Sequence, residues 1–237
     1  MKKGSILHHK YFNGVTPVNI SSRYKELVLE YSKYWGMFGT GTLSMICNEQ
    51  GIYNWNNTDK IVEFSITNGL DLHYNTLINS NINQYPKWFR DLKPQDKLNT
   101  LEEYIEKVLN RYKGKISFYK LINECIRVED ENFLDTELHK IDFITKIYNF
   151  SKNIFPNDKY MINEFGLITH DDIRNSFTTL LDDLKRNGVI FDYIGEQGHL
   201  GYTKPYYFLP EDKQINDSLI EIYNRFETPI MITEFDL

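Results

Sequence analysis

Two glutamates in this chain follow short apolar runs of the kind that form β-strands. Glu124 comes directly after a run that ends at Asn123, and Glu234 comes directly after residues 229–233. In a parallel barrel the carboxyl ends of all strands face one mouth, so both carboxylates would converge there. A retaining glycosidase needs such a pair about 5–5.5 Å apart, with one carboxyl group as acid/base and the other as nucleophile. Because glutamates are common at strand ends, this placement needs further support.

The segments that must position these residues alternate between short strand-like runs and longer runs with helical periodicity. The predicted strands are 11–16, 36–40, 70–78, 115–122, 160–163, 191–194 and 230–233. The predicted helices are 22–33, 58–68, 98–112, 135–150, 171–187 and 215–226. This alternation is typical of βα units, and seven strands favour a barrel over a doubly wound sheet, although periodicity alone leaves both open. No linker interrupts residues 1–237, which we predict to be one domain.

Composition and spacing exclude several other classes of protein. The 237 residues carry 27 Lys+Arg against 33 Asp+Glu, a net charge of −6, with no long basic run, so we expect no nucleic-acid or membrane-surface partner. No apolar stretch reaches the length of about 18 residues that a membrane span needs. Cys47 and Cys125 have no metal or redox spacing, and neither have the histidines, so we predict no metal and no cofactor.

Three motifs, in order along the chain, give the two glutamates a context. Residues 121–124 read Leu-Ile-Asn-Glu, residues 194–200 read Ile-Gly-Glu-Gln-Gly-His-Leu, and residues 229–237 read Pro-Ile-Met-Ile-Thr-Glu-Phe-Asp-Leu. They resemble the acid/base strand, the intervening Gln-His segment and the nucleophile strand of glycoside hydrolase family 10, the endo-β-1,4-xylanase family. Segments 49–55, 85–89 and 160–165 are also similar to the family, so the resemblance covers essentially residues 11–237.

The resemblance implies a (β/α)8 TIM barrel and a retaining endo-β-1,4-glycanase. The implied substrate is a polysaccharide or oligosaccharide, namely xylan or a related plant-cell-wall β-glycan, and the implied mechanism is double displacement. Glu234 would be the nucleophile and Glu124 the acid/base. The family is usually secreted, whereas residues 1–9 lack the apolar core of a signal peptide, so the localisation stays open.

The resemblance also implies supporting roles for other polar residues near the pair. Asn123 would bind the sugar's 2-OH, while Gln197 and His199 would hold the nucleophile and the sugar, with Asp236 steering His199. Trp88 is a candidate for stacking on a sugar ring, with ordinary loop packing as the alternative. Glu196 is interpreted as structural, because strand alternation points it away from its neighbours.

The chain departs from the family pattern at several places. Residues 38–44 lack the Glu, Asn and Lys that bind xylose hydroxyls in the family, and Asn79-Ser80 replaces its Trp-His. Only three residues follow Glu234, so we predict strands 1–7 without the eighth βα unit and a catalytic domain that is incomplete at its C-terminus. Two alternatives remain open: a carbohydrate-binding relative with impaired catalysis and a degenerate glycone site, and an interaction protein whose incomplete barrel needs a partner.

Overall fold

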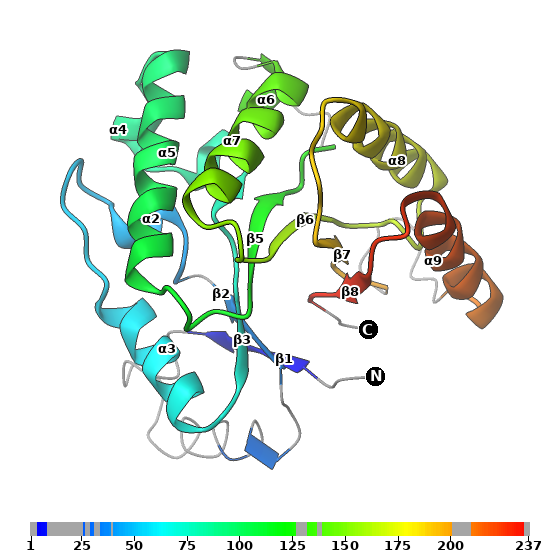
Figure 1. The fold of residues 1–237 in the computed structure, drawn as a ribbon, viewed down its shortest axis with the longest axis horizontal. Helices are drawn as coiled ribbons and strands as arrows, with labels where there is room; N and C mark the ends of the chain where they lie inside the picture. Colours follow the sequence, from blue (N-terminus) through cyan, green and yellow to red (C-terminus); the bar gives the residue numbers. More distant parts are fainter. Residues whose placement is uncertain are drawn as a thin grey trace. The chain divides into compact units, whose positions relative to one another are not determined.

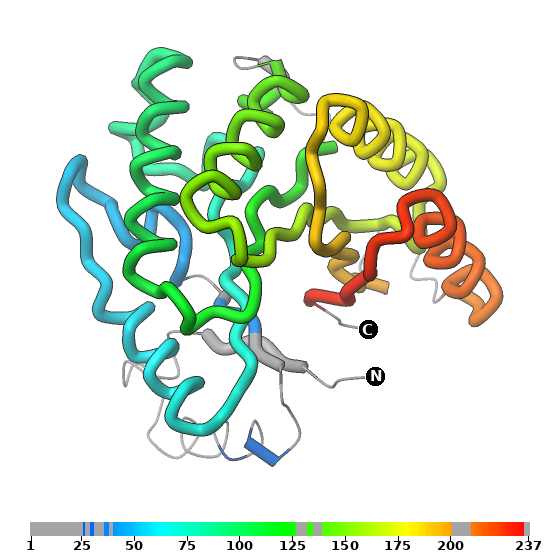
Figure 2. The backbone as a smooth tube through the Cα atoms, viewed as in Figure 1, coloured from blue at the N-terminus to red at the C-terminus, as the bar shows by residue number. Residues whose placement is uncertain are grey.

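The fold is a series of parallel strands with helices between them. The structure, a computed structural model, describes residues 4–8, 26, 29–30, 34–38, 40–126, 132–136, 139–200 and 210–234. The strand order is β1-β2-β3-β5-β6-β7-β8, with the short β4 paired to β5 (Figure 1). The pairings β1–β2, β2–β3, β3–β5, β6–β7 and β7–β8 are parallel. The alternation of strand and helix, which Figure 2 traces along the chain, confirms the α/β class.

The bounds of the described elements are as follows. The strands are β1 (Gly4–His8), β2 (Tyr34–Phe38), β3 (Asp71–Tyr74), β4 (Ile78–Asn79), β5 (Phe118–Asn123), β6 (Tyr160–Glu164), β7 (Tyr193–Glu196) and β8 (Ile230–Ile232). The helices are α2 (Leu43–Ile46), α3 (Asn56–Thr67), the 3-10 turn η2 (Ile82–Gln84), α4 (Lys87–Arg90), α5 (Pro94–Arg111), α6 (Phe133–Thr136), α7 (Lys140–Ile154), α8 (Asp171–Arg186) and α9 (Asp212–Phe226).

The chain divides into two compact units, with the boundary inside β5. Unit 1 comprises Met1–Ile78 and Ile82–Lys120, and unit 2 comprises Asn79–Asn81 and Leu121–Leu237. Unit 1 therefore holds β1 to β3 and the helices α2 to α5, and unit 2 holds β6 to β8 and the helices α6 to α9. All the residues that we predict to act at the site belong to unit 2, except Trp88.

Helix α5 shows how the sequence builds the core of unit 1. It begins at Pro94, whose ring fits the first turn of a helix because the missing N–H has no intrahelical partner there. Apolar side chains recur every three or four residues along it and are buried: Leu98, Leu101, Ile105, Val108 and Leu109. The predicted start at residue 98 was wrong, because the first turn of this helix is polar.

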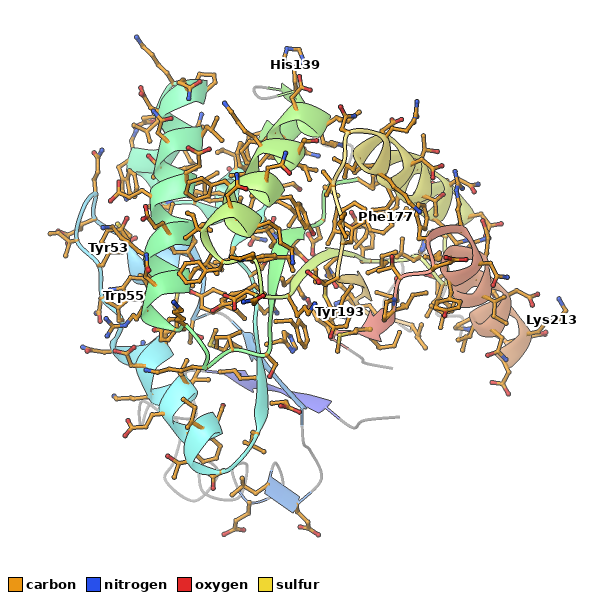
Figure 3. The ribbon with its side chains drawn as sticks, in the orientation of Figure 1. Tyr53, Trp55, His139, Phe177, Tyr193 and Lys213 are labelled. Carbon is orange, nitrogen blue, oxygen red and sulfur yellow. The ribbon has the colours of Figure 1, made fainter. Side chains whose placement is uncertain are left out.

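The strands of unit 2 are covered by amphipathic helices. All five residues of β6 are buried, as expected for a parallel strand with both faces covered. Phe177, on the inner side of α8, is fully buried, whereas Lys213 extends from the outer end of α9 (Figure 3). Ion pairs join α8 to α9, from Arg174 to Glu221 and from Arg225 to Asp182. No strand follows β8 among the described residues, which extend to Glu234.

Most predicted elements are found within a few residues of their expected bounds, and the exceptions have local causes. The predicted strand 11–16 lies outside the described residues, and β1 at Gly4–His8 was not predicted. Of the predicted helix 22–33, only residues 26, 29 and 30 are described, and these are helical. The predicted strand 70–78 is interrupted, because Thr76 and Leu77 both donate hydrogen bonds to the carbonyl of Lys120 in β5. The predicted helix 135–150 begins at Lys140, after the short α6.

Candidate active site

The candidate site of unit 2 lies at the carboxyl ends of three parallel strands. Asn123 is the last residue of β5, and Glu124 follows it. Gln197 comes directly after β7, with His199 two residues further on. Glu234 comes two residues after the end of β8. Because these strands end at the same edge of the sheet, their terminal side chains are brought to one region.

Gln197 links the two glutamates through its side chain and its backbone. Its Nε2 donates a hydrogen bond of 2.8 Å to Oε1 of Glu124. Its carbonyl accepts a hydrogen bond of 2.7 Å from the backbone N–H of Glu234. Gln197 is only 3% exposed, so its amide has little freedom to turn. One buried residue therefore fixes both Glu124 and the backbone that carries Glu234.

His199 lies beside Glu234. Its Nε2 is 3.7 Å from Oε2 of Glu234, which is too long for a hydrogen bond but close enough for electrostatic attraction when the imidazole is protonated. The side chain of Glu234 is 11% exposed and that of His199 is 32% exposed. The predicted pairing of His199 with Glu234 is therefore compatible with the geometry. Asp236, which we expected to steer His199, lies outside the described residues.

Asn123 belongs to a hydrogen-bond network with two polar residues that the sequence analysis did not select. Nδ2 of Asn163, in β6, donates a hydrogen bond of 2.7 Å to Oδ1 of Asn123. The hydroxyl of Thr233 donates a hydrogen bond of 2.8 Å to Oδ1 of Asn163. All three side chains are buried, so this network is shielded from water. The sequence held one signal for Asn163, because the dipeptide Asn163-Glu164 repeats Asn123-Glu124 at the end of the next strand.

Ser80 holds the backbone of Glu124. The N–H of Ser80 donates a hydrogen bond of 3.1 Å to the carbonyl of Asn123, and its hydroxyl donates to the carbonyl of Glu124. Glu124 has φ of 56°, in the left-handed region that residues other than glycine seldom adopt. The Asn79-Ser80 pair, which replaces the Trp-His of the family pattern, thus contributes a backbone support where the sequence analysis saw only a loss.

Gly195 lies opposite Asn163 in the pairing of β6 with β7. A Cβ at this position would overlap Oδ1 of Asn163 and would come within 2.8 Å of Sδ of Met161. We therefore expect Gly195→Ala to lower the free energy of unfolding by about 1–3 kcal/mol, as overpacked cores do. Urea unfolding measures this. The cost should shrink in an Asn163→Ala background, where the overlapping atom is gone, and an equal cost in both backgrounds would contradict this explanation.

Two buried carboxyl groups lie just behind the site. Glu164, the last residue of β6, is fully buried, and Glu196, its partner in register on β7, is 1% exposed. Burial raises the pKa of Glu164 to about 8, although hydrogen bonds from the backbone N–H groups of Ile126 and Phe165 lower it. Burial likewise raises the pKa of Glu196 to about 7. The sequence analysis did not select Glu164 and interpreted Glu196 only as structural.

The raised pKa of Glu164 predicts that stability falls as the pH rises. Between the ordinary pKa of 4.5 and about 8, the folded protein holds a proton that the unfolded chain releases. We therefore expect the free energy of unfolding to decrease by roughly 2–4 kcal/mol between pH 5 and pH 8.5 because of this group. Urea unfolding of wild type and Glu164→Gln across this range tests the prediction, and the variant should show the flatter profile.

Asp192 supplies a matched control for this pH dependence. Burial alone would raise its pKa, but hydrogen bonds from Lys152, the N–H of Tyr160 and Lys159 lower it. Its contribution to stability is therefore present above the unfolded pKa and is lost only at more acidic pH. Asp192→Asn should lower stability while leaving the slope between pH 5 and pH 8.5 unchanged. A wild-type slope that survives in Glu164→Gln would assign the effect to another group.

Trp88, the remaining predicted site residue, lies in α4 of unit 1. Its Nε1 donates a hydrogen bond of 3.1 Å to the carbonyl of Cys47, and its ring makes an edge contact with Phe89 at 6.0 Å between centroids. These contacts fix the indole within unit 1, and a role in sugar stacking stays a prediction. Tyr53 and Trp55, labelled in Figure 3, stack on each other at 5.6 Å in the same unit.

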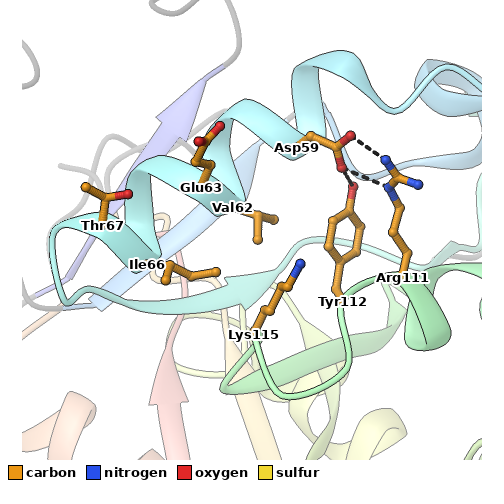
Figure 4. A pocket seen from close by; sticks show the side chains of 8 residues that line it. All are labelled: Asp59, Val62, Glu63, Ile66, Thr67, Arg111, Tyr112 and Lys115. Carbon is orange, nitrogen blue, oxygen red and sulfur yellow. Dashed lines mark hydrogen bonds and ion pairs between the residues drawn. The ribbon is translucent and has the colours of Figure 1, made fainter.

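Unit 1 also contains a pocket of about 530 Å³ that includes none of the predicted site residues. Figure 4 shows its lining, which comes from α3 and from the end of α5 with the turn that follows it: Asp59, Val62, Glu63, Ile66, Thr67, Arg111, Tyr112 and Lys115. Asp59 accepts hydrogen bonds from Arg111 and from the hydroxyl of Tyr112. Asp59, Arg111 and Tyr112 are thus paired with one another within the lining.

Neither a metal centre nor a membrane span is found in the part of the chain that the structure describes. No group of three or more His, Cys, Asp or Glu residues there could hold a metal ion. Cys47 and Cys125 are buried and are not joined in a disulfide. No helix within the described ranges is long and apolar enough to cross a bilayer.

Comparison with known families identifies the chain. The model of glycosyl hydrolase family 10 matches residues 9–237. The chain belongs to this family. The resemblance that the three motifs indicated is therefore confirmed, and the match includes the strand ends that carry Glu124, Gln197 and Glu234.

Curated relatives extend beyond the region that this chain matches. A β-1,4-xylanase of Dictyoglomus thermophilum is 28% identical over 233 residues, which are 96% of this chain and 58% of the relative. The endo-1,4-β-xylanase B of Neocallimastix patriciarum is 26% identical over 82% of this chain and 23% of its own length. The chain therefore spans little more than half of the length of the first relative and less than a quarter of the second.

Solved structures show the fold. Xylanase 10B of Thermotoga petrophila, in complex with xylobiose, superposes with a TM-score of 0.83 over 98% of this chain and 69% of its own, at 23% identity. Native xylanase 10B of Thermotoga maritima gives the same TM-score and coverage. The predicted fold class, a (β/α)8 barrel with strands 1–7, is thereby confirmed for the matched region.

Proposed function

We propose that this chain is a retaining glycoside hydrolase that cleaves β-1,4-linked xylan, with Glu234 as nucleophile and Glu124 as acid/base. The observation that carries the proposal is the double role of Gln197, which binds the Glu124 carboxylate and accepts a hydrogen bond from the backbone of Glu234. A double displacement requires two carboxyl groups, one as acid/base and one as nucleophile, and Gln197 links the glutamate that follows β5 to the one that follows β8.

The two glutamates divide the reaction between them. Glu234, ionised, attacks the anomeric carbon, and the bond from that carbon to the leaving oxygen breaks as Glu124 delivers its proton to this oxygen. A covalent ester between the sugar and Glu234 results. Glu124, now ionised, takes a proton from water, whose oxygen attacks the same carbon and releases Glu234. The two inversions leave the product with the configuration of the substrate.

The supporting residues follow from their contacts. Asn163 occupies the side-chain oxygen of Asn123, so the amide nitrogen of Asn123 is the group available to bind a sugar 2-OH, as the family pattern suggests. His199, 3.7 Å from Glu234, would stabilise the ionised nucleophile when protonated. Gln197 donates to Oε1 of Glu124, which restricts the rotation of this carboxyl group. A misplacement of about 1 Å at such positions costs about 100-fold in rate.

Xylan is the substrate class that the relatives support. Their names describe β-1,4-xylanases, and a structural neighbour holds xylobiose. The segment from Thr40 to Ser44 lacks the charged sugar ligands of the family pattern and makes packing contacts within unit 1 instead, where the hydroxyl of Thr58 donates to the carbonyl of Thr40. We therefore propose weaker discrimination between xylose and related sugars than the full family pattern would give.

Release of nitrophenol from an aryl β-xylobioside tests this proposal, together with the NMR configuration of the first sugar product. We expect turnover with a β-configured first product. An aryl β-cellobioside should also be hydrolysed. Its kcat/KM should fall less far below that of the xylobioside than it would in a family member that has the full set of sugar ligands. A folded chain that binds xylo-oligosaccharides but turns over neither substrate would favour the carbohydrate-binding alternative, and an inverted product would exclude the double displacement.

A further inference from the structure

Glu196 joins two loops at the candidate site with one carboxylate. It is the last residue of β7 and is 1% exposed. Its Oε2 accepts a hydrogen bond of 2.8 Å from the N–H of Leu167, in the loop after β6. Its Oε1 accepts a hydrogen bond of 3.1 Å from the N–H of Gly198. Gly198 lies between Gln197 and His199, so this bond fixes the turn that separates the two side chains.

The backbone of Glu196 extends the same connection to β8. Its carbonyl accepts a hydrogen bond of 2.8 Å from the N–H of Thr233 and a longer one, of 3.4 Å, from the hydroxyl of Thr233. Thr233 directly precedes Glu234. Glu196 thus contacts the backbone on both sides of the site, although its carboxylate does not belong to the pair that we propose to react.

We propose that Glu196 is a positioning residue for the reaction, because its ionised carboxylate fixes the turn at Gly198 and so directs Gln197 and His199 at the two reacting carboxylates. This inference rests on the proposed function. Gly198 has φ of 85°, a conformation that glycine adopts without strain, and the bond from its N–H is what holds the chain in this turn. Without it, the side chains on either side of Gly198 would lose their common anchor.

Ionisation strengthens the two bonds of Glu196. Each oxygen accepts from a backbone N–H, and an ionised carboxylate is a stronger acceptor than a protonated carboxyl group. Burial raises the pKa of Glu196 to about 7, despite the lowering by these N–H groups and by His199. The positioning should therefore be complete above neutral pH and should weaken below it.

Charged groups around Glu196 come from several elements. Glu164, in register on β6, interacts electrostatically with Glu196, and His199 carries the opposite charge when protonated. From α8, Arg174 donates through Nη1 to the carbonyl of Leu167 and pairs with Glu221 of α9. Glu164 titrates nearby, so an experiment must separate its protonation from that of Glu196.

Glu196→Gln tests the inference with aryl β-xylobioside kinetics between pH 5 and pH 9. The variant keeps the size of the side chain but loses its charge. We expect kcat to fall about 10- to 100-fold while KM changes by less than about threefold, as for a misaligned site that still binds substrate. The pH profile of kcat should also change, because the step that follows the ionisation of Glu196 near pH 7 should be absent in the variant.

Asp192→Asn is the matched control, because Asp192 is a carboxylate that accepts a backbone N–H near the other end of β7. It should lower stability while retaining the wild-type kcat and pH profile. If Glu196→Gln keeps the wild-type kcat and profile, or if Asp192→Asn reproduces its loss, the positioning role is overturned.

Amide NMR makes the test independent of turnover. In wild type, the N–H resonances of Leu167 and Gly198 should titrate together near neutral pH, whereas those of Ile126 and Phe165 should follow Glu164. Glu196→Gln should abolish only the first titration. A wild-type protein without turnover would refute the proposed function. The amide titration would still show whether Glu196 positions the turn at Gly198. Resonances of Gly198 that do not titrate, or that titrate in the variant, would overturn it.

Discussion

Replacing Glu234 by alanine is expected to lower kcat on an aryl β-xylobioside by at least about 10⁴-fold. Glu234 would form the covalent bond to the anomeric carbon, and neither Gln197 nor His199 can supply a carboxylate in its place. The alanine leaves a cavity on the face of the sugar from which the nucleophile attacks. Azide added to the variant should enter this cavity and give a glycosyl azide of inverted configuration.

Glu106→Ala is the matched control for this variant. Glu106 lies on the exposed face of α5 in unit 1, where alanine suits a helix at least as well as glutamate. Its kinetics should equal those of wild type. Residual turnover of Glu234→Ala within about tenfold of wild type, with an intact fold by circular dichroism, would remove Glu234 from the role of nucleophile.

Glu124→Ala should give a loss that depends on the leaving group. Proton delivery contributes about 10²–10⁴-fold, so hydrolysis of xylan, whose leaving group is a poor alkoxide, should fall by that factor. The acidic phenol of an aryl xylobioside leaves without receiving a proton. The first step on this substrate should therefore change little, and the covalent intermediate should accumulate. Azide should then speed turnover and give a product of retained configuration.

The contrast between the two variants assigns the roles. Azide products of opposite configuration are expected, because azide replaces the nucleophile in one variant and the attacking water in the other. Products of the same configuration from Glu124→Ala and Glu234→Ala would contradict the assignment. A Glu124→Ala variant equally impaired on both substrates would show that Glu124 does more than transfer a proton.

Periodicity identified the helices of both units, because the apolar face of an amphipathic helix is written locally in the sequence. Helix α8 was predicted as 171–187 and is found at Asp171–Arg186. Boundaries failed where tertiary contacts override local preference. The break between β3 and β4 depends on the carbonyl of Lys120, a partner more than 40 residues away, which no local pattern of Thr76 and Leu77 indicates.

The sequence by itself determined the family, the α/β class and the placement of Glu124 and Glu234 after strands. Those features depend on residue type and short-range order, which a motif such as Leu-Ile-Asn-Glu preserves. Only the tertiary structure decided which side chains meet. Asn163, Thr233 and Ser80 reach the site because neighbouring strands place them there, and the register of β6 and β7 aligns Glu164 with Glu196.

The positioning role that we propose for Glu196 could not be predicted from its place in β7, and burial is the physical reason. Alternation along β7 predicts that it points away from its neighbours, but alternation does not reveal which groups contact the carboxylate. The N–H groups of Leu167 and Gly198 satisfy the carboxylate while the surrounding chain excludes water. The free energy of a buried charge depends on partners brought together by folding, and those partners are not adjacent in the sequence.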